Sequence, residues 1–408
     1  MSALSARERG ALRRLAARVA EAAASPRLAT VRRRWRDVNA LRRPDRAPVW
    51  CRPVGCWPEL LPESALVCLD PWARDVERAL RRTIVKLEIG DDTPVPPTFP
   101  VAHAWRVEPP NVWGVEIGRH SSGIEGGAWS YDPPLTDEGG EEWLATPRWT
   151  PDRAATERAI ERVEEAIGDI LPPALVGESP LHSVLCVYAA ELRGLTGLLL
   201  DIRANPARVH RLMAYLREAV LAAMDAAEEA GALAPNNDGP MTCSDPLGPP
   251  APDGRARLSN QWVMTNGQEF DAVSPRHWEE FLLAYQRPIL ARYGAVGYGC
   301  CENLTYKLDG VLSLPNLRIV VCSAWTSLDA VIERAGDRCC IMWRQRASDV
   351  VFPDDLAVVA RDLDEGTRAL RGRAYQIVLR ELQTLAGHPR RLHEWTRLAI
   401  QAAERHAA

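Results

Sequence analysis

Two apolar runs that each end in a thiol constrain the fold of this chain more than any other stretch. Cys300 and Cys301, flanked by glycine, follow the apolar run 295–298, and Cys322 closes the run 319–322. The 21 residues from Cys301 to Cys322 match about one strand–helix unit of a parallel α/β fold. Because such folds place their chemistry at the carboxyl ends of parallel strands, the spacing predicts that these thiols lie at one functional rim.

Short apolar runs alternate with helical segments through the second half of the chain, which predicts a parallel sheet. Asn205-Pro206 and Ser274-Pro275 each read as a helix start, and Gly231 reads as a helix end. The number of units favours an α/β fold closed as a (β/α)8 TIM-type barrel over an open sheet. We also expect a strand at 83–89 and two C-terminal helices within 373–408, at about 373–387 and 389–406.

The chain divides into an N-terminal helical extension, residues 1–44, and a barrel domain, residues 45–408. The extension contains one expected helix, 5–39, which we interpret as a peripheral element on the outside of the barrel. Residues 90–150 are rich in tryptophan, proline and glycine and lack helical periodicity. Disordered segments are poor in aromatic residues, so this stretch is predicted to be an ordered, irregular lid insertion. It would contain short antiparallel strands such as 113–117.

The charge and composition exclude several classes of protein. The formal net charge is −4, which gives no basic excess for binding nucleic acid or an anionic membrane. No apolar run approaches the roughly 18 residues of a membrane span. Ten cysteines in 408 residues do not form a disulfide scaffold, and the N-terminus has no apolar signal segment. These features predict a cytoplasmic protein with reduced thiols that acts on a small molecule.

The rim thiols suggest a metal site. Cys301 or Cys300, together with Cys322 and a carboxylate, would suit a zinc ion that keeps one open coordination position. Glu269 follows the run 261–265 and is the candidate carboxylate ligand or the catalytic base, and Glu302 is the second candidate catalytic carboxylate. The alternative interpretation is that the cysteines are small buried hydrophobic residues.

Three residues near expected strand ends are candidates for substrate binding. They are Tyr298, His182 and Asp245, the last in a proline-rich segment, 243–253, interpreted as a strand-exit loop. For Asp245 a plain turn is the competing interpretation. The chain has no glycine-rich dinucleotide or phosphate loop and no nucleophile elbow.

Dispersed motifs from about residue 150 to 402 resemble the uroporphyrinogen decarboxylase-like superfamily, in particular its bacterial branch. The matching segments, in order, are 169–177, 197–201, 206–213, 273–275, 298–302, 314–318, 323–325 and 384–392. The resemblance implies a (β/α)8 barrel, and it is looser over 50–120. The superfamily contains cofactor-free tetrapyrrole decarboxylases and zinc-dependent methyltransferases that act with corrinoid proteins or thiols.

The resemblance favours the methyltransferases. The decarboxylases carry an N-terminal motif of the type Arg-Gln-Ala-Gly-Arg, and this chain has no such motif. The methyltransferases bind zinc through a His-x-Cys motif, at the strand where this chain has residues 298–301, and through a later cysteine. This chain has no histidine there, so a second cysteine or Glu269 must replace it. We therefore expect a zinc-dependent methyltransferase that moves a methyl group between a small substrate and either a corrinoid carried by a partner protein or a thiol. A metal-free carboxy-lyase and a non-catalytic binding protein are the alternatives.

Overall fold

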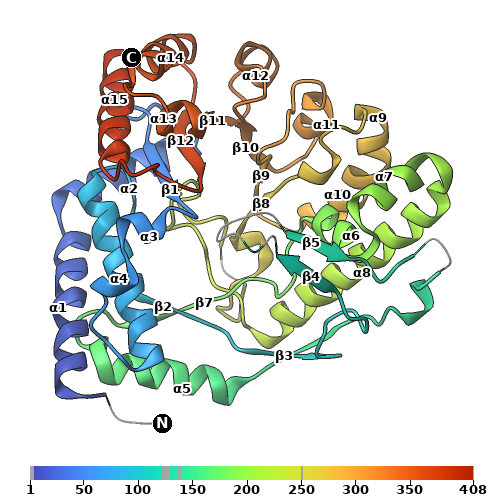
Figure 1. Ribbon diagram of the computed structural model, residues 1–408, viewed down its shortest axis with the longest axis horizontal. Helices are drawn as coiled ribbons and strands as arrows, with labels where there is room; N and C mark the ends of the chain where they lie inside the picture. Colours follow the sequence, from blue (N-terminus) through green and yellow to red (C-terminus); the bar gives the residue numbers. More distant parts are fainter. Residues whose placement is uncertain (1–3, 122, 124–128, 137–138, 250, 408) are drawn as a thin grey trace.

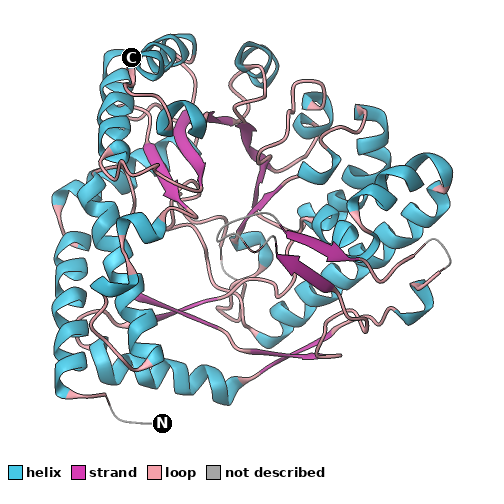
Figure 2. Ribbon diagram, in the orientation of Figure 1, coloured by secondary structure: helices cyan, strands magenta, loops and turns pink. Residues whose placement is uncertain are grey.

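The computed structural model describes residues 4–121, 123, 129–136, 139–249 and 251–407. Six parallel strands form a central sheet that curls as half of a barrel, in the order β1-β12-β11-β10-β9-β8 (Figure 1, Figure 2). The strands are β1 (Val49–Pro53), β8 (Trp262–Thr265), β9 (Ala295–Tyr298), β10 (Leu317–Cys322), β11 (Cys340–Gln345) and β12 (Tyr375–Leu382). The predicted α/β class and parallel sheet are confirmed.

Two further strands stand apart from the half-barrel. β2 (Phe99–Ala102) and β7 (Pro173–Val176) pair with each other in parallel. Within the described ranges, no ladder joins β2 to β1 or β7 to β8. The structure thus shows a parallel half-barrel and a separate parallel pair, and the full eight-stranded barrel stays a prediction.

Helices that follow the strands cover the outer face of the half-barrel. They are α9 (Pro275–Trp278), α10 (Ala284–Leu290), α11 (Leu308–Leu312), α12 (Leu328–Ala335), α13 (Ala347–Val351), α14 (Ala357–Ala369) and α15 (Arg391–Arg405). Three more helices, α6 (Leu185–Arg193), α7 (Leu195–Ala204) and α8 (Pro206–Ala230), pack on one another, and α8 packs on α10. The predicted caps form: Asn205 and Ser274 accept backbone N–H groups at the starts of α8 and α9, and Gly231 ends α8 with a left-handed φ of 63°. None of the described helices is long and apolar enough to cross a membrane.

The N-terminal region forms two helices, α1 (Ala6–Ala23) and α2 (Pro26–Asn39), because Ser25 caps a new helix at Pro26. They pack with α4 (Pro71–Ile89) and α5 (Arg153–Val163) in a second core, which also contains inward-facing sheet residues such as Met342 and Val378. At the end of α2, the Asn39 amide donates to two carbonyl groups of the segment before β8, and it accepts from Gln376 at the start of β12. The extension therefore closes the amino end of the half-barrel rather than decorating its exterior.

Two apolar segments have a different secondary structure from the predicted one. Residues 83–89 alternate like a strand, but they continue α4, which runs from its Asp70 cap to Gly90 and buries apolar residues at helical spacing. Residues 375–382 are strand β12 rather than a helix. β12 lies between β1 and β11 and its first five residues are all buried, so its apolar run reflects burial on both faces.

Gly177, directly after β7, offers a test of the packing. A Cβ atom at this position would lie 1.8 Å from the backbone oxygen of Ala232, which cannot move like a side chain. We expect Gly177→Ala to lower the free energy of unfolding by about 1–3 kcal/mol in urea denaturation. Gly239→Ala is the control, because its Cβ would meet no atom within 4 Å. Equal stability of the two variants would contradict this packing.

Candidate functional site

The carboxyl ends of three neighbouring strands form the predicted rim. Glu269 follows β8 within a short 3-10 turn, Cys301 follows β9, and Cys322 ends β10. Because β8, β9 and β10 are parallel and adjacent, the three residues lie at the same end of the sheet, as predicted. Their side chains nevertheless have different surroundings.

Cys300, Cys301 and Glu381 form a compact group, which we call the thiol–carboxylate group. The two sulfur atoms lie 3.7 Å apart, and the sulfurs and a carboxylate oxygen of Glu381 all lie within 4.8 Å of one another. Both thiols are partly exposed, and Glu381 is exposed. Sulfur and carboxylate ligands so arranged could hold a metal ion.

A β-bulge brings Glu381 to this position. The pairing of β12 with β1 shifts register after Leu379, so that two residues of β12, Arg380 and Glu381, oppose a single residue of β1. Glu381 also has a left-handed φ of 61°, which is rare outside glycine and is often found at functional sites. The irregular backbone at the end of β12 therefore carries the carboxylate to the thiols.

Arg344, at the end of β11, connects Cys300 with Glu381. Its Nη1 donates to the Cys300 carbonyl at 2.7 Å, contacts the Cys300 sulfur at 3.7 Å, and pairs with Glu381 at 3.2 Å. The side chain is only 2% exposed, and its Nε and Nη2 atoms have no partner. Arg380 is also largely buried; its Nε makes no hydrogen bond and lies 3.8 Å from a carboxylate oxygen of Glu381. Burial and the charge of Arg344 lower the pKa of Arg380 to about 10.

The pKa values of the two thiols are shifted in opposite directions. A hydrogen bond from Cys301, followed by the positive charges of Arg344 and Arg380, lowers the pKa of Cys300 to about 5. The same hydrogen bond, together with burial, raises the pKa of Cys301. At neutral pH the pair is therefore a Cys300 thiolate that accepts a hydrogen bond from the Cys301 thiol.

Backbone contacts hold this turn in place. Gly299 has a φ of +117°, and a Cβ there would lie 2.8 Å from the Cβ of Val321. The buried Glu302 carboxylate accepts the backbone N–H groups of Cys300 at 2.8 Å and Gly267 at 2.9 Å, and burial raises its pKa. Glu302, a predicted catalytic residue, thus fastens the thiol turn to the end of β8.

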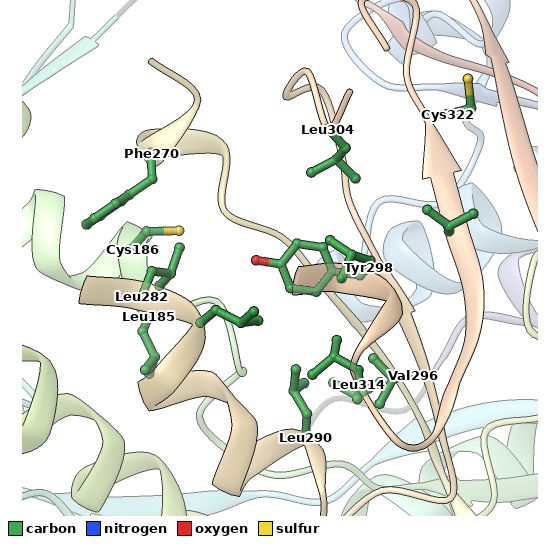
Figure 3. Packing of buried hydrophobic residues seen from close by; sticks show 14 of the residues in the cluster. Leu185, Cys186, Phe270, Leu282, Leu290, Val296, Tyr298, Leu304, Leu314 and Cys322 are labelled. Atoms are coloured by element: carbon green, nitrogen blue, oxygen red, sulfur yellow. The ribbon is translucent and has the colours of Figure 1, made fainter. Parts of the chain in front are cut away.

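Cys322 and Glu269, the other predicted ligands, lie outside the thiol–carboxylate group. The Cys322 sulfur contacts the backbone oxygen of Thr326 at 3.5 Å, and burial raises its pKa to about 12. Figure 3 shows Cys322 at the far end of its strand, away from Cys186 and Tyr298. Glu269 interacts with the buried thiol of Cys186, whose pKa its charge helps to raise, and its Oε2 is buried without a partner.

The three predicted substrate-binding residues are separated. Tyr298 is fully buried among apolar side chains (Figure 3). Its hydroxyl donates to Gln286 at 3.0 Å. His182 is exposed after β7 and stacks on Tyr188, with ring centroids 4.3 Å apart. Asp245 pairs with Arg42 at 3.1 Å. The interpretation of 243–253 as a strand-exit loop is wrong, because this segment follows α8 and leads into β8 at the amino end.

A cavity of about 790 Å³ lies beside β2, β7 and β8, where the ladders are interrupted. Its wall includes His182 and the exposed Leu175 and Val176. Three buried polar atoms of residues in its wall have no partner: the hydroxyls of Ser179 and Ser183 and Oε1 of Gln261. The volume suits a small organic molecule.

The predicted lid contains two antiparallel pairs, β3 (Trp105–Glu108) with β6 (Arg148–Pro151) and β4 (Gly118–Ser121) with β5 (Trp129–Asp132). The expected strand at 113–117 does not form. Trp113 packs its ring on Tyr188 of α6, and Tyr215 of α8 donates to the Ala145 carbonyl. These contacts hold the segment against α6 and α8. The side chain of Trp129 and residues 122, 124–128 and 137–138 lie outside the described residues.

Sequence reasoning missed Glu381, Arg344 and Arg380. The wrong helix at 373–387 removed two of them from consideration. Arg344 directly follows the apolar run 339–343, and this position at the end of an expected strand was the signal that could have identified it. Comparisons with known proteins add no assignment: no family model matches the chain, and no curated protein matches its sequence.

Proposed function

We propose that the thiol–carboxylate group binds zinc and that the protein is a methyltransferase. The observation that carries the metal proposal is the 3.7 Å separation of the Cys300 and Cys301 sulfurs. Zn–S bonds of about 2.3 Å at tetrahedral angles require an S···S distance of about 3.8 Å. Glu381 would be the third ligand, and three protein ligands leave a fourth position open, as in catalytic zinc sites.

The methyl-transfer proposal rests on the resemblance to zinc-dependent relatives and on the donor set. Bound zinc would lower the pKa of a substrate thiol, so that a thiolate could accept a methyl group. Arg344 would orient Cys300 and Glu381 through its contacts with both residues. Glu302 would hold the thiol turn through the Cys300 amide, and Glu269 is the candidate base. The methyl donor would be a corrinoid carried by a partner protein. The cavity beside β7 and β8, in a completed (β/α)8 barrel, would hold the body of the small substrate.

A metal-free carboxy-lyase is the second candidate, and the arginines favour it. Arg52, Arg380 and Arg344 come from three adjacent strands, and Arg52 and Arg344 both act on the pKa of Arg380. The charges of Arg344 and Arg380 act on the Cys300 thiolate, and both arginines pair with Glu381. Arg52 adds a third positive charge that acts on Arg380. The excess positive charge and the unpartnered guanidinium nitrogens would suit a substrate carboxylate, and they oppose a bound cation.

Zinc content separates the two candidates. We expect the protein, purified without chelator, to contain close to one zinc per chain by elemental analysis. Cys300→Ala and Cys301→Ala should each weaken zinc binding by more than about tenfold, because each removes a ligand. Cys322→Ala is the matched control and should retain the metal, since its thiol lies outside the group. Wild-type protein that stays metal-free when zinc is offered would favour the carboxy-lyase.

A further inference from the structure

We propose that Cys300 and Cys301 are a reversible dithiol–disulfide pair that is oxidised by a low-molecular-weight disulfide such as oxidised glutathione. Their sulfurs lie 3.7 Å apart, and both side chains reach solvent. The exchange itself requires no metal and is independent of the proposed function. Only its consequence, the loss of two zinc ligands on oxidation, rests on that function.

A second adjacent cysteine pair shows that neighbouring positions in the sequence do not by themselves bring two sulfurs together. Cys339 and Cys340 enter β11, where successive side chains point to opposite faces. Cys340 belongs to the second core, with the N-terminal helices, whereas Cys339 belongs to the other core, with the helices outside the half-barrel; both are buried. Cys300 and Cys301 instead follow β9, after the left-handed Gly299, where the turning backbone lets both sulfurs lie on one side. Of the ten cysteines, these two alone are not buried.

Cys300 is the attacking sulfur. Arg344 Nη1 lies 3.7 Å from it, and a guanidinium at this distance favours the thiolate. The Cys300 thiolate would attack one sulfur of glutathione disulfide, form a mixed disulfide and release one glutathione thiolate. Cys301, after losing its proton to the released thiolate, would attack the Cys300 sulfur and release the second glutathione. The two cysteines are then oxidised to one disulfide, and the glutathione disulfide is reduced to two thiols.

The ring that forms should be easy to reduce. Adjacent Cα atoms lie about 3.8 Å apart across a trans peptide, whereas Cα atoms joined by a disulfide are usually about 4.4–6.8 Å apart. The strain makes such a bond more readily reduced than a structural disulfide. The pair therefore suits a reversible switch that is closed under oxidising conditions and opened by reduced glutathione.

Peptide mass spectrometry tests the proposal on the native, metal-free full chain. The protein is equilibrated at graded ratios of reduced to oxidised glutathione, free thiols are alkylated, and the peptide with Cys300 and Cys301 is compared with that of Cys339 and Cys340. We expect the first peptide to lose two hydrogens and escape alkylation at oxidising ratios, and to recover fully with dithiothreitol. The Cys339–Cys340 peptide should remain reduced. A Cys300–Cys301 peptide that stays alkylated at every ratio would overturn the proposal.

Two single variants test the order of attack. Cys301→Ser should accumulate a mixed disulfide between Cys300 and glutathione, because the resolving thiol is missing. Cys300→Ser should form at least about tenfold less adduct under the same conditions, because Arg344 donates to the Cys300 sulfur and acts on Cys301 only through its charge. Circular dichroism confirms that each variant is folded before treatment. Equal adduct formation by the two variants would contradict the assignment of Cys300 as the attacking sulfur.

Discussion

Asp92→Asn is expected to lower the free energy of unfolding by about 3–5 kcal/mol, because it removes a buried carboxylate that bonds the guanidiniums of both Arg34 and Arg46. Arg34 and Arg46 each bond the Asp92 carboxylate at 2.6 Å, and the backbone N–H of Val49 donates to it at 2.8 Å. The carboxylate is 3% exposed, and the two arginine side chains are 8% and 9% exposed. The network ties α2 to the start of β1, so its loss should loosen the closure of the amino end.

Urea denaturation measures this effect, with Asp75→Asn as the matched control. Asp75 also pairs with an arginine, Arg78, at 2.5 Å, but its side chain is 75% exposed. Solvent screens such surface pairs, and we expect the control to change the free energy by less than about 1 kcal/mol. If Asp92→Asn is no more destabilising than Asp75→Asn, the buried network does not hold the N-terminal helices as described.

Local signals in the sequence predicted the parallel sheet well where strands and helices alternate. The caps at Asn205 and Ser274 and the end at Gly231 depend on backbone groups within one turn, so the residues alone reveal them. The predictions for 83–89 and 375–382 were wrong because they rested on apolar patterns rather than on caps. Their apolar patterns fit more than one period, and tertiary partners decided the outcome: the long α4 in one case, and two flanking strands in the other.

The site was predictable only as far as strand ends could be located. That reasoning placed Cys300 and Cys301 at the carboxyl rim, but it could not decide on which face of β10 the thiol of Cys322 lies. Both faces of a parallel strand are apolar, so its sequence carries little information about direction. Glu381 depends on a bulge in β12, a register shift that no pattern within β12 reveals.

The zinc proposal and the dithiol proposal share one physical requirement, a Cys300 thiolate near neutral pH. Zinc would need it as a ligand, and disulfide exchange would need it as a nucleophile. The hydrogen bond from Cys301 and the charges of Arg344 and Arg380 supply that thiolate before any metal binds. The reactivity of Cys300 in metal-free protein is therefore a direct measure of the electrostatics of the site.

Alkylation of Cys300 by iodoacetamide is expected to remain fast down to about pH 5, the pKa that the site gives this thiol. An ordinary cysteine, with a pKa of about 8.5, would already lose most of its thiolate below pH 8. Because the pKa is lowered, the reactive thiolate is present above about pH 5 and is lost only as the pH falls through that value. The rate is measured on chelator-treated protein by mass spectrometry of the peptide with Cys300.

Cys301→Ala should raise the pKa of Cys300, because the hydrogen bond from Cys301 is the largest cause of its shift. At pH 6 the alkylation rate of Cys300 should then fall by more than about tenfold, even though a thiolate of higher pKa is intrinsically more nucleophilic. Arg344→Met removes a smaller contribution and should slow the reaction less. Cys322→Ala leaves all these contacts in place and should match the wild type. A wild-type rate that falls tenfold for each pH unit from 8 to 6 would show that Cys300 is an ordinary thiol.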